Sequence, residues 1–153
     1  MRNALLAGLI LILAGANEGT VQRHASGTFV PVGPPAAPPV RVDAGGACVV
    51  DLIQRYEVSG TLTGRLEANY RILVAGPCGS PPGTFDERWI AHGTFDGAVN
   101  GRAAAATFWY TAQVGEGGAV RGKLALRGGI NGDLVVSGRF SEGKLSYAGS
   151  LKE

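Results

Sequence analysis

The sequence predicts an all-β protein: an antiparallel up-and-down barrel of about eight strands, with a two-sheet β-sandwich as the alternative. Apolar residues occupy every second position of several consecutive segments, a period of two that is typical of strands with one buried face. Glycine is abundant, at 25 of 153 residues, and no proline follows Pro82, so the second half of the chain can pair continuously. We favour the barrel because closure leaves no exposed sheet edge.

The composition is that of one domain with a core of its own. Apolar residues make up 45% of the chain, enough for a hydrophobic interior, whereas the formal net charge is only +2. The basic residues form no run. Nucleic acids and anionic membranes are therefore not expected as partners, because both need a concentrated basic patch.

The N-terminus has the pattern of a secretory signal peptide. Arg2 precedes an apolar run over residues 4–14, and Ala14-Gly15-Ala16 has the small residues of a cleavage site. The run is too short to span a bilayer. We expect residues 1–16 to be removed, which leaves no membrane span and a secreted or periplasmic protein. A retained anchor or a buried strand is the alternative for this segment.

Cys48 and Cys78 are the two cysteines of the chain. In an oxidising compartment an even count is most simply one disulfide, so a Cys48–Cys78 bond is predicted, with two unpaired thiols as the alternative. A zinc site built with His24 and His92 would need closely spaced ligand pairs, and the sequence has none. We expect no metal and no other cofactor.

Residues 17–46 are expected to lead into the barrel rather than to form it. Residues 17–25 show no periodicity, and residues 27–32 are compatible with a short first strand. Five prolines crowd residues 31–39, where they cannot donate to a strand ladder. We interpret this segment as a linker, or as a strap across the barrel mouth, before a barrel domain over residues 47–153.

The barrel domain begins with predicted strands over residues 47–58 and 61–72, separated by a turn at Ser59-Gly60. The Gly- and Pro-rich loop over residues 76–83 follows, and the predicted disulfide would hold it. The second strand has the more regular alternation of apolar and polar residues, and its apolar positions are Leu62, Leu66, Ala68, Tyr70 and Ile72.

Residues 85–95 alternate again, and Asp96-Gly97 after them predicts a hairpin turn. Residues 98–113 are ambiguous, because the alanines at 103–106 favour helix while the Thr and aromatic residues at 107–111 favour strand. We assign strand, since hairpins are expected on both sides. Three more strands follow, with apolar faces formed by Val120, Leu124, Leu126, Ile130, Leu134, Val136, Phe140, Leu145, Tyr147 and Leu151.

Three stretches share a cadence of Gly-x-apolar-x-Gly hairpins: SGTLTGRLEANYRI, AHGTFDGAVNGRA and GDLVVSGRFSEGKLSYAGSL. In this cadence the chain, over residues 47–152, resembles the small barrels of the allene oxide cyclase barrel-like group, whose bacterial members are largely uncharacterised. For the plant enzymes of that group, the resemblance implies a shaped apolar cavity that guides a cyclisation. Their catalytic residues match no positions here, so no catalytic role is carried over.

Glu87 has the same parity as Phe85 and Trp89, which directs it toward the apolar side of its strand. A carboxylate there needs a partner or has a raised pKa, and Tyr70, also on an apolar face, is the predicted hydrogen-bond partner. The candidate ligand-binding residues are therefore Glu87, Tyr70, Trp89 and Phe85. The alternative places Glu87 near a barrel mouth, in contact with water.

No motif in the sequence names a reaction. Residues 117–123 (GGAVRGK) match part of a phosphate-binding loop, but Leu124 replaces the residue that would bind magnesium, and a strand rather than a helix should follow. His92 is interpreted as a surface histidine. Catalytic residues stay unassigned, and we consider binding a better prediction than catalysis.

The predicted function is that of a secreted, non-enzymatic small β-barrel that either binds a small apolar ligand or has no ligand at all. One alternative is a structural or interaction protein of the cell envelope or matrix. Another is a cyclase or isomerase that confines its substrate in a cavity, with Glu87 and Tyr70 as polar groups. A cavity of a few hundred cubic ångströms would separate the binding and enzyme hypotheses from the interaction hypothesis.

Overall fold

A computed structural model describes residues 21–152 of the chain. The predicted signal peptide at residues 1–16 lies outside the described residues. A single 3-10 turn among the described residues, η1, covers Phe140–Glu142. The strands are β1 (Gln22–Pro31), β2 (Val40–Asp43), β3 (Cys48–Gly60), β4 (Leu62–Val74), β5 (Glu87–Val99), β6 (Arg102–Gly115), β7 (Ala119–Gly128), β8 (Asn131–Arg139) and β9 (Lys144–Lys152).

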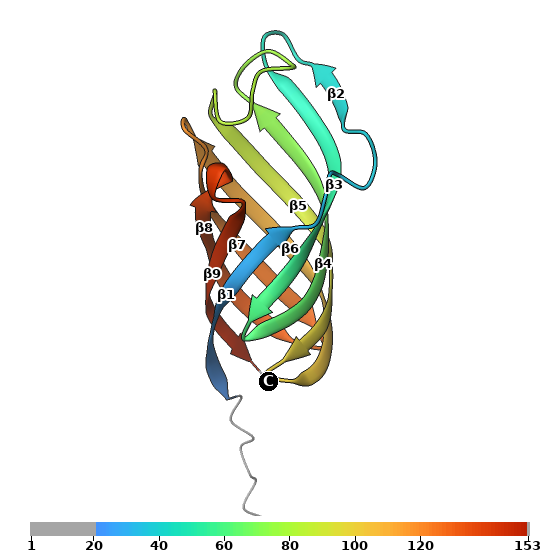
Figure 1. Ribbon diagram of the computed structural model, residues 1–153, viewed down its shortest axis with the longest axis vertical. Helices are drawn as coiled ribbons and strands as arrows, with labels where there is room; N and C mark the ends of the chain where they lie inside the picture. The colour runs from blue at the N-terminus through green and yellow to red at the C-terminus, as the bar shows by residue number, and fades with distance from the viewer. Residues whose placement is uncertain (1–20, 153) are drawn as a thin grey trace, which may run out of the picture.

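Eight of the strands close into an antiparallel barrel, which confirms the predicted fold and excludes the sandwich (Figure 1). The sheet order runs from β1 through β9, β8, β7, β6, β5 and β4 to β3, and β1 also pairs with β3 to complete the circle. The remaining strand, β2, adds to the free edge of β3 at one end of the barrel. Consecutive strands from β3 to β9 are neighbours, as in an up-and-down meander.

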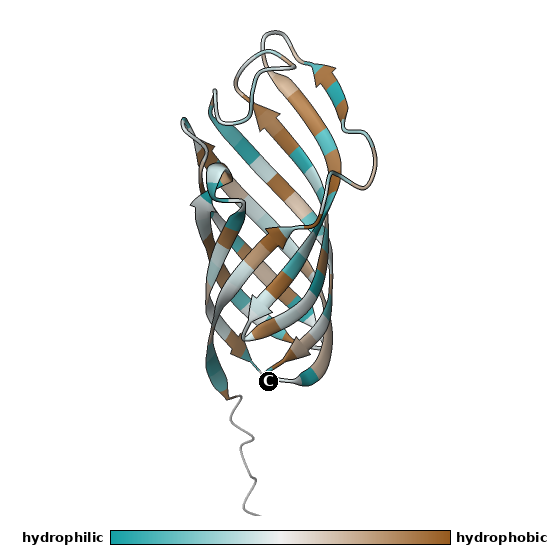
Figure 2. Ribbon diagram, in the orientation of Figure 1, coloured by the Kyte–Doolittle hydropathy of each residue, from teal (hydrophilic) through white to brown (hydrophobic). Residues whose placement is uncertain are grey.

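The barrel interior is a hydrophobic core, and the predicted alternation of faces is confirmed. Figure 2 shows hydrophobic and hydrophilic residues alternating along the strands. On β7, Val120, Leu124 and Leu126 are buried while the intervening charged residues are exposed. Of two adjacent aromatic residues on β6, Phe108 is 2% exposed and Trp109 is 62% exposed, because successive side chains of a strand point to opposite faces. Residues 98–113 are strand, as predicted, apart from the hairpin turn that divides them.

That hairpin turn is at Asn100-Gly101, and the turn predicted at Asp96-Gly97 is wrong. Asn100 and Gly101 have φ of 49° and 82°, the positive values that a tight two-residue hairpin needs. Gly97 instead lies inside β5, opposite Gly64 of β4. A Cβ atom at Gly97 would meet the backbone of β4, so glycine is needed there for close approach of two strands rather than for a turn.

The barrel starts earlier than the predicted boundary at residue 47. β1 pairs with β9 from Gln22 and with β3 as far as Pro31, so residues 22–25, expected to be a loose leader, belong to a full barrel strand. The Pro-rich segment does not cross the mouth. It runs along the edge of β3, where the amides of Val32 and Ala36 donate to carbonyl oxygens of β3. Sequence alternation is weak here because Ala25 and Phe29 are the only two fully buried residues among the ten of β1.

Candidate functional site

A pocket of about 330 Å³ lies at the end of the barrel where β2 is attached. β1 ends at Pro31, opposite Tyr56 in the middle of β3, so the first half of β3 has β2 as its neighbour instead of β1. The barrel wall is therefore open between this half of β3 and the turn that joins β8 to β9. The apolar lining includes Val50, Leu52, Ile72, Val74 and Leu145.

One side of the pocket is formed by the loop over residues 75–86, held by the predicted disulfide, which is confirmed. Cys48 at the start of β3 is bonded to Cys78 in the loop, with 4.9 Å between their Cα atoms. Both cysteines line the pocket. The loop is also anchored to the next hairpin by a 2.9 Å bond from the amide of Gly117 to the carbonyl of Gly83. The disulfide thus keeps a short irregular loop in place beside the opening.

Trp89 forms the aromatic centre of the pocket. Its ring packs edge-on against Tyr70, at 5.6 Å between centroids, and at a tilt against Phe140 of η1, at 5.1 Å. Its indole Nε1 donates a 2.7 Å hydrogen bond to Glu87, whose other carboxylate oxygen accepts a 3.5 Å bond from the amide of Gly83. Glu87 is only 8% exposed, so this carboxylate is a buried polar group with two donors.

Two tyrosine hydroxyls form the inner polar group of the pocket. The Tyr56 and Tyr70 oxygens are 2.9 Å apart and hydrogen-bonded, and both residues are 8% exposed. Burial raises the pKa of Tyr70 well above its ordinary value, and the neighbouring Tyr56 raises it further. Burial also raises the pKa of Tyr56. Both groups therefore stay protonated and act as neutral hydrogen-bond donors at physiological pH.

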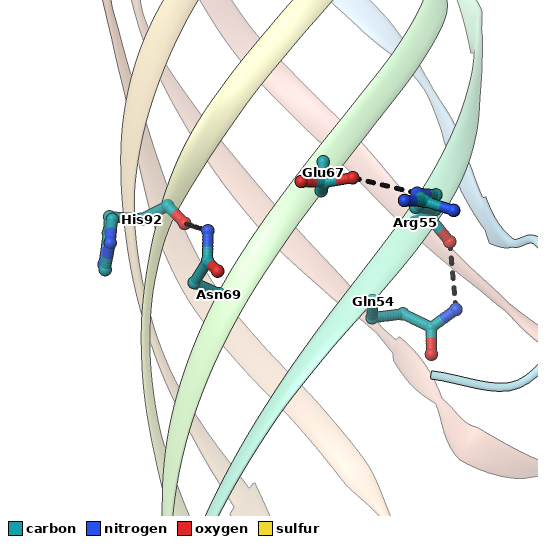
Figure 3. Close-up of polar contacts among 5 residues, drawn as sticks. All are labelled: Gln54, Arg55, Glu67, Asn69 and His92. Carbon is teal, nitrogen blue, oxygen red and sulfur yellow. Dashed lines mark hydrogen bonds and ion pairs between the residues drawn. The ribbon is translucent and has the colours of Figure 1, made fainter. Parts of the chain in front are cut away.

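Gln54 adds an amide to the wall of the pocket. Its Nε2 donates to the carbonyl oxygens of Arg55, at 3.0 Å, and of Gly33 in the Pro-rich segment, at 3.3 Å. Figure 3 shows this amide next to the outward-facing pair of Arg55 and Glu67, a 2.8 Å ion pair on the barrel exterior. The glutamine therefore ties the Pro-rich segment to β3 at the side of the opening.

Cationic side chains occur where the pocket meets solvent. Arg41 of β2, Arg139 at the end of β8 and Lys144 at the start of β9 belong to its lining. Arg139 also donates a 3.4 Å hydrogen bond to the carbonyl of Gly117. The pocket thus combines an apolar interior, a few buried polar groups and a basic rim, an arrangement that suits binding of a small molecule.

Three of the four predicted ligand-binding residues come together in this pocket: Glu87, Tyr70 and Trp89. Phe85 is not part of the lining. It lies in the loop before β5, where its ring is so close to Gly76 that a Cβ atom there would clash with it. The predicted bond between Glu87 and Tyr70 is also wrong, because Glu87 accepts from Trp89 and Tyr70 bonds to Tyr56.

Gln54, Tyr56 and the basic rim were not predicted from the sequence. The alternation of β3, counted back from buried Val58, would have directed Tyr56, Gln54 and Leu52 inward. The rim residues had no such signal. Arg139 and Lys144 are paired across the β8–β9 hairpin, and the closure of the barrel brings Arg41 of β2 to the same opening.

His92 lies on the exterior, as expected, and packs against exposed Trp109 at 5.5 Å between ring centroids. Figure 3 shows its carbonyl oxygen accepting a 3.4 Å bond from Asn69. Within residues 21–152 no group of three or more His, Cys, Asp or Glu side chains is arranged to hold a metal ion. The same residues include no helix with the length and apolar character to cross a membrane.

No protein-family model, curated protein or solved structure matches the chain. The protein is a small antiparallel β-barrel with one disulfide and a pocket at its open end.

Proposed function

We propose that the protein is an exported carrier or receptor barrel that binds a small apolar molecule in the pocket at its open end. The observation that carries the proposal is the pocket of about 330 Å³ itself, within the size range of small-molecule sites. Its walls are mostly aliphatic and aromatic, so an apolar molecule gains from leaving water there. Trp89, Tyr70 and Glu87 supply an aromatic surface and a few polar contacts.

Export is the second part of the proposal. The signal-peptide pattern of residues 1–16 supports it, and so does the Cys48–Cys78 disulfide, since such bonds persist in oxidising compartments. Intact-mass measurement of the protein recovered outside the cytoplasm tests this part. We expect a mass without the first 16 residues and lower by two hydrogens at the cysteines. An uncleaved chain with two thiols would contradict it.

Ligand binding is tested with Trp89 as a reporter in the pocket. The chain has two tryptophans, and Trp109 is on the exterior, so a Trp109→Phe variant reports on the pocket alone. Native mass spectrometry of the protein from its own host identifies a co-purifying molecule, and titration of that molecule should change the Trp89 emission. An emission unchanged by this molecule and by a panel of apolar compounds would count against binding.

A matched pair of substitutions locates the site. Val50→Phe places extra volume in the pocket lining and should weaken binding at least about tenfold by occlusion. Val135→Phe makes the same change on the outer face of β8, where Val135 is 58% exposed, and should leave binding unchanged. Equal effects of both variants would place the ligand elsewhere.

The interaction hypothesis has an observation of its own. A groove of about 580 Å³ on the outer face of β3, β4 and β5 includes Val40 and Ile90, which are 60% and 51% exposed. Ile90→Asp would abolish such an interaction and leave the emission response of Trp89 intact.

The enzyme hypothesis uses the same pocket as the binding hypothesis, and turnover of the co-purifying molecule would distinguish the two. The resemblance to the allene oxide cyclase barrel-like group supports the enzyme hypothesis, because the plant enzymes of that group guide a cyclisation in a cavity.

A further inference from the structure

Beneath the pocket lies a second, smaller cavity of about 20 Å³. Tyr56, Tyr70 and Leu145 line both cavities, so the two cavities adjoin at the tyrosine pair. The rest of the inner lining is apolar, with one exception, Tyr110. The smaller cavity has the volume of roughly one water molecule, since about 10–15 Å³ of such space holds one.

Tyr110 has a buried hydroxyl without a partner. The residue is 3% exposed, and its oxygen has no hydrogen-bond partner among the described residues. Tyrosine hydroxyls usually find a partner when buried, because an unpaired one carries its full desolvation cost. Its ring packs edge-on against Tyr70, at 6.3 Å between centroids, and over Gly122, where a Cβ atom would clash with it. The ring is therefore fixed, and the hydroxyl cannot move to another site.

The protons of the three hydroxyls outnumber their acceptors. The bond between Tyr56 and Tyr70 uses one proton, whichever residue donates. The second proton of the pair and that of Tyr110 have no acceptor within residues 21–152. Burial raises the pKa of Tyr110, and the nearby Tyr56 raises it further, so these groups remain donors. One oxygen with two lone pairs would satisfy both.

We infer that Tyr56, Tyr70 and Tyr110 form a recognition site for a neutral hydrogen-bond acceptor, and that the ligand is an apolar molecule carrying a carbonyl oxygen at its inner end. The inference rests on the proposed function and adds the chemical class of the ligand. A carboxylate is disfavoured, because the cavity lining has no cation and Arg41, Arg139 and Lys144 line only the outer pocket.

Two probes of equal shape test the inference: methyl nonyl ketone, and the hydrocarbon in which a methylidene group replaces the carbonyl oxygen. Their affinities are measured by Trp89 emission in the Trp109→Phe background. We expect the ketone to bind about tenfold more tightly, the value of roughly one hydrogen bond. Tyr110→Phe should reduce that preference without weakening the hydrocarbon, because only the second proton of the Tyr56–Tyr70 pair then remains to bind the ketone oxygen.

Tyr147→Phe is the matched control. Tyr147 is also buried, but its hydroxyl accepts from the amide of Leu62 at 2.9 Å and it lines neither cavity. The variant should lower stability and leave the ketone preference unchanged. The infrared carbonyl band of bound ketone is a measurement that needs no variant. It should shift to lower frequency relative to the ketone in hydrocarbon solvent.

The outcomes separate the two proposals. Equal affinities for ketone and hydrocarbon, with an unshifted carbonyl band, would overturn the acceptor site and leave the binding function standing. A crystal structure with bound ketone and a resident water on Tyr110 would overturn it as well, by showing that water is the acceptor. Binding of neither probe, nor of any other apolar compound, would overturn both.

Discussion

The indole Nε1 of Trp89 donates a 2.7 Å hydrogen bond to the carboxylate of Glu87, two residues earlier on β5. Residues at i and i+2 of a strand share a face, so one strand supplies both partners. The bond gives a buried acidic group a donor and holds the indole in contact with both Tyr70 and Phe140. The contact therefore shapes the pocket as well as stabilising it.

Replacing Glu87 tests this contact. Glu87→Leu leaves the buried indole N–H without an acceptor and should lower the free energy of unfolding by about 1–3 kcal/mol, measured by urea denaturation. Glu87→Gln keeps an acceptor oxygen and should change it by less than about 1 kcal/mol. In a Trp89→Phe background the difference between the two substitutions should shrink to the contribution of the long 3.5 Å bond from the Gly83 amide, because the indole donor is gone. Equal stability of both variants with Trp89 present would show that the bond is unimportant.

The disulfide should stabilise the fold. The cysteines are 30 residues apart, and closing a loop of that length contributes roughly 3–4 kcal/mol on the chain-entropy model. Reduction with dithiothreitol should lower the free energy of unfolding by about that amount and expose the 75–86 loop to protease. A Cys48→Ser, Cys78→Ser double variant is the control and should not respond to the reductant. Unchanged proteolysis after reduction of the native chain would contradict the role of the bond in holding the loop.

A side chain at Gly27 is predicted to lower the stability of the fold. A Cβ atom at Gly27 would meet the carbonyl oxygen of Ser59 and the hydroxyl of Tyr147, where β1 is paired with β3 on one side and β9 on the other. Gly27→Ala should therefore cost about 3 kcal/mol, the upper end for overpacking, because the obstacle includes backbone. Gly115→Ala meets nothing within 4 Å and should change stability by less than about 0.5 kcal/mol. Thermal denaturation of both variants compares them, and equal melting temperatures would refute the close approach.

Stability should fall at alkaline pH. The pKa values of Tyr56, Tyr70 and Tyr110 are raised in the folded protein, chiefly by burial. Above about pH 10 the unfolded chain loses these protons while the folded protein keeps them. This contribution is therefore fully present below about pH 10 and is lost as the pH rises further. Urea denaturation at a series of pH values measures the slope, which Tyr70→Phe should reduce. An identical slope in that variant would contradict the prediction.

Much of the barrel was predictable, because a period of two identifies which side chains of a strand share a face. This reasoning placed Glu87, Trp89 and Tyr70 on the interior face. The turn prediction was wrong, because it was made from residue types in a short segment and not from the period. Asp96-Gly97 resembles a turn, yet glycine there serves the approach of two strands, and the better signal, Asn-Gly at residues 100–101, is four residues further on. Gln54 and Tyr56 were overlooked, although they are four and two residues before Val58 and therefore share its buried face of β3.

The sequence by itself determined the fold class, the face on which each side chain of the long strands lies, and the pairing of the only two cysteines. The fold class and the strand faces depend on residues one or two positions apart, and the cysteine pairing depends on the number of cysteines. The tertiary structure alone decided that β1 closes the barrel, that it stops at Pro31 and leaves an opening, and that Tyr56, Tyr70 and Tyr110 meet beneath that opening. These residues come from different strands, and their distances depend on how the strands curve and pair around the barrel, which no short-range pattern in the chain specifies.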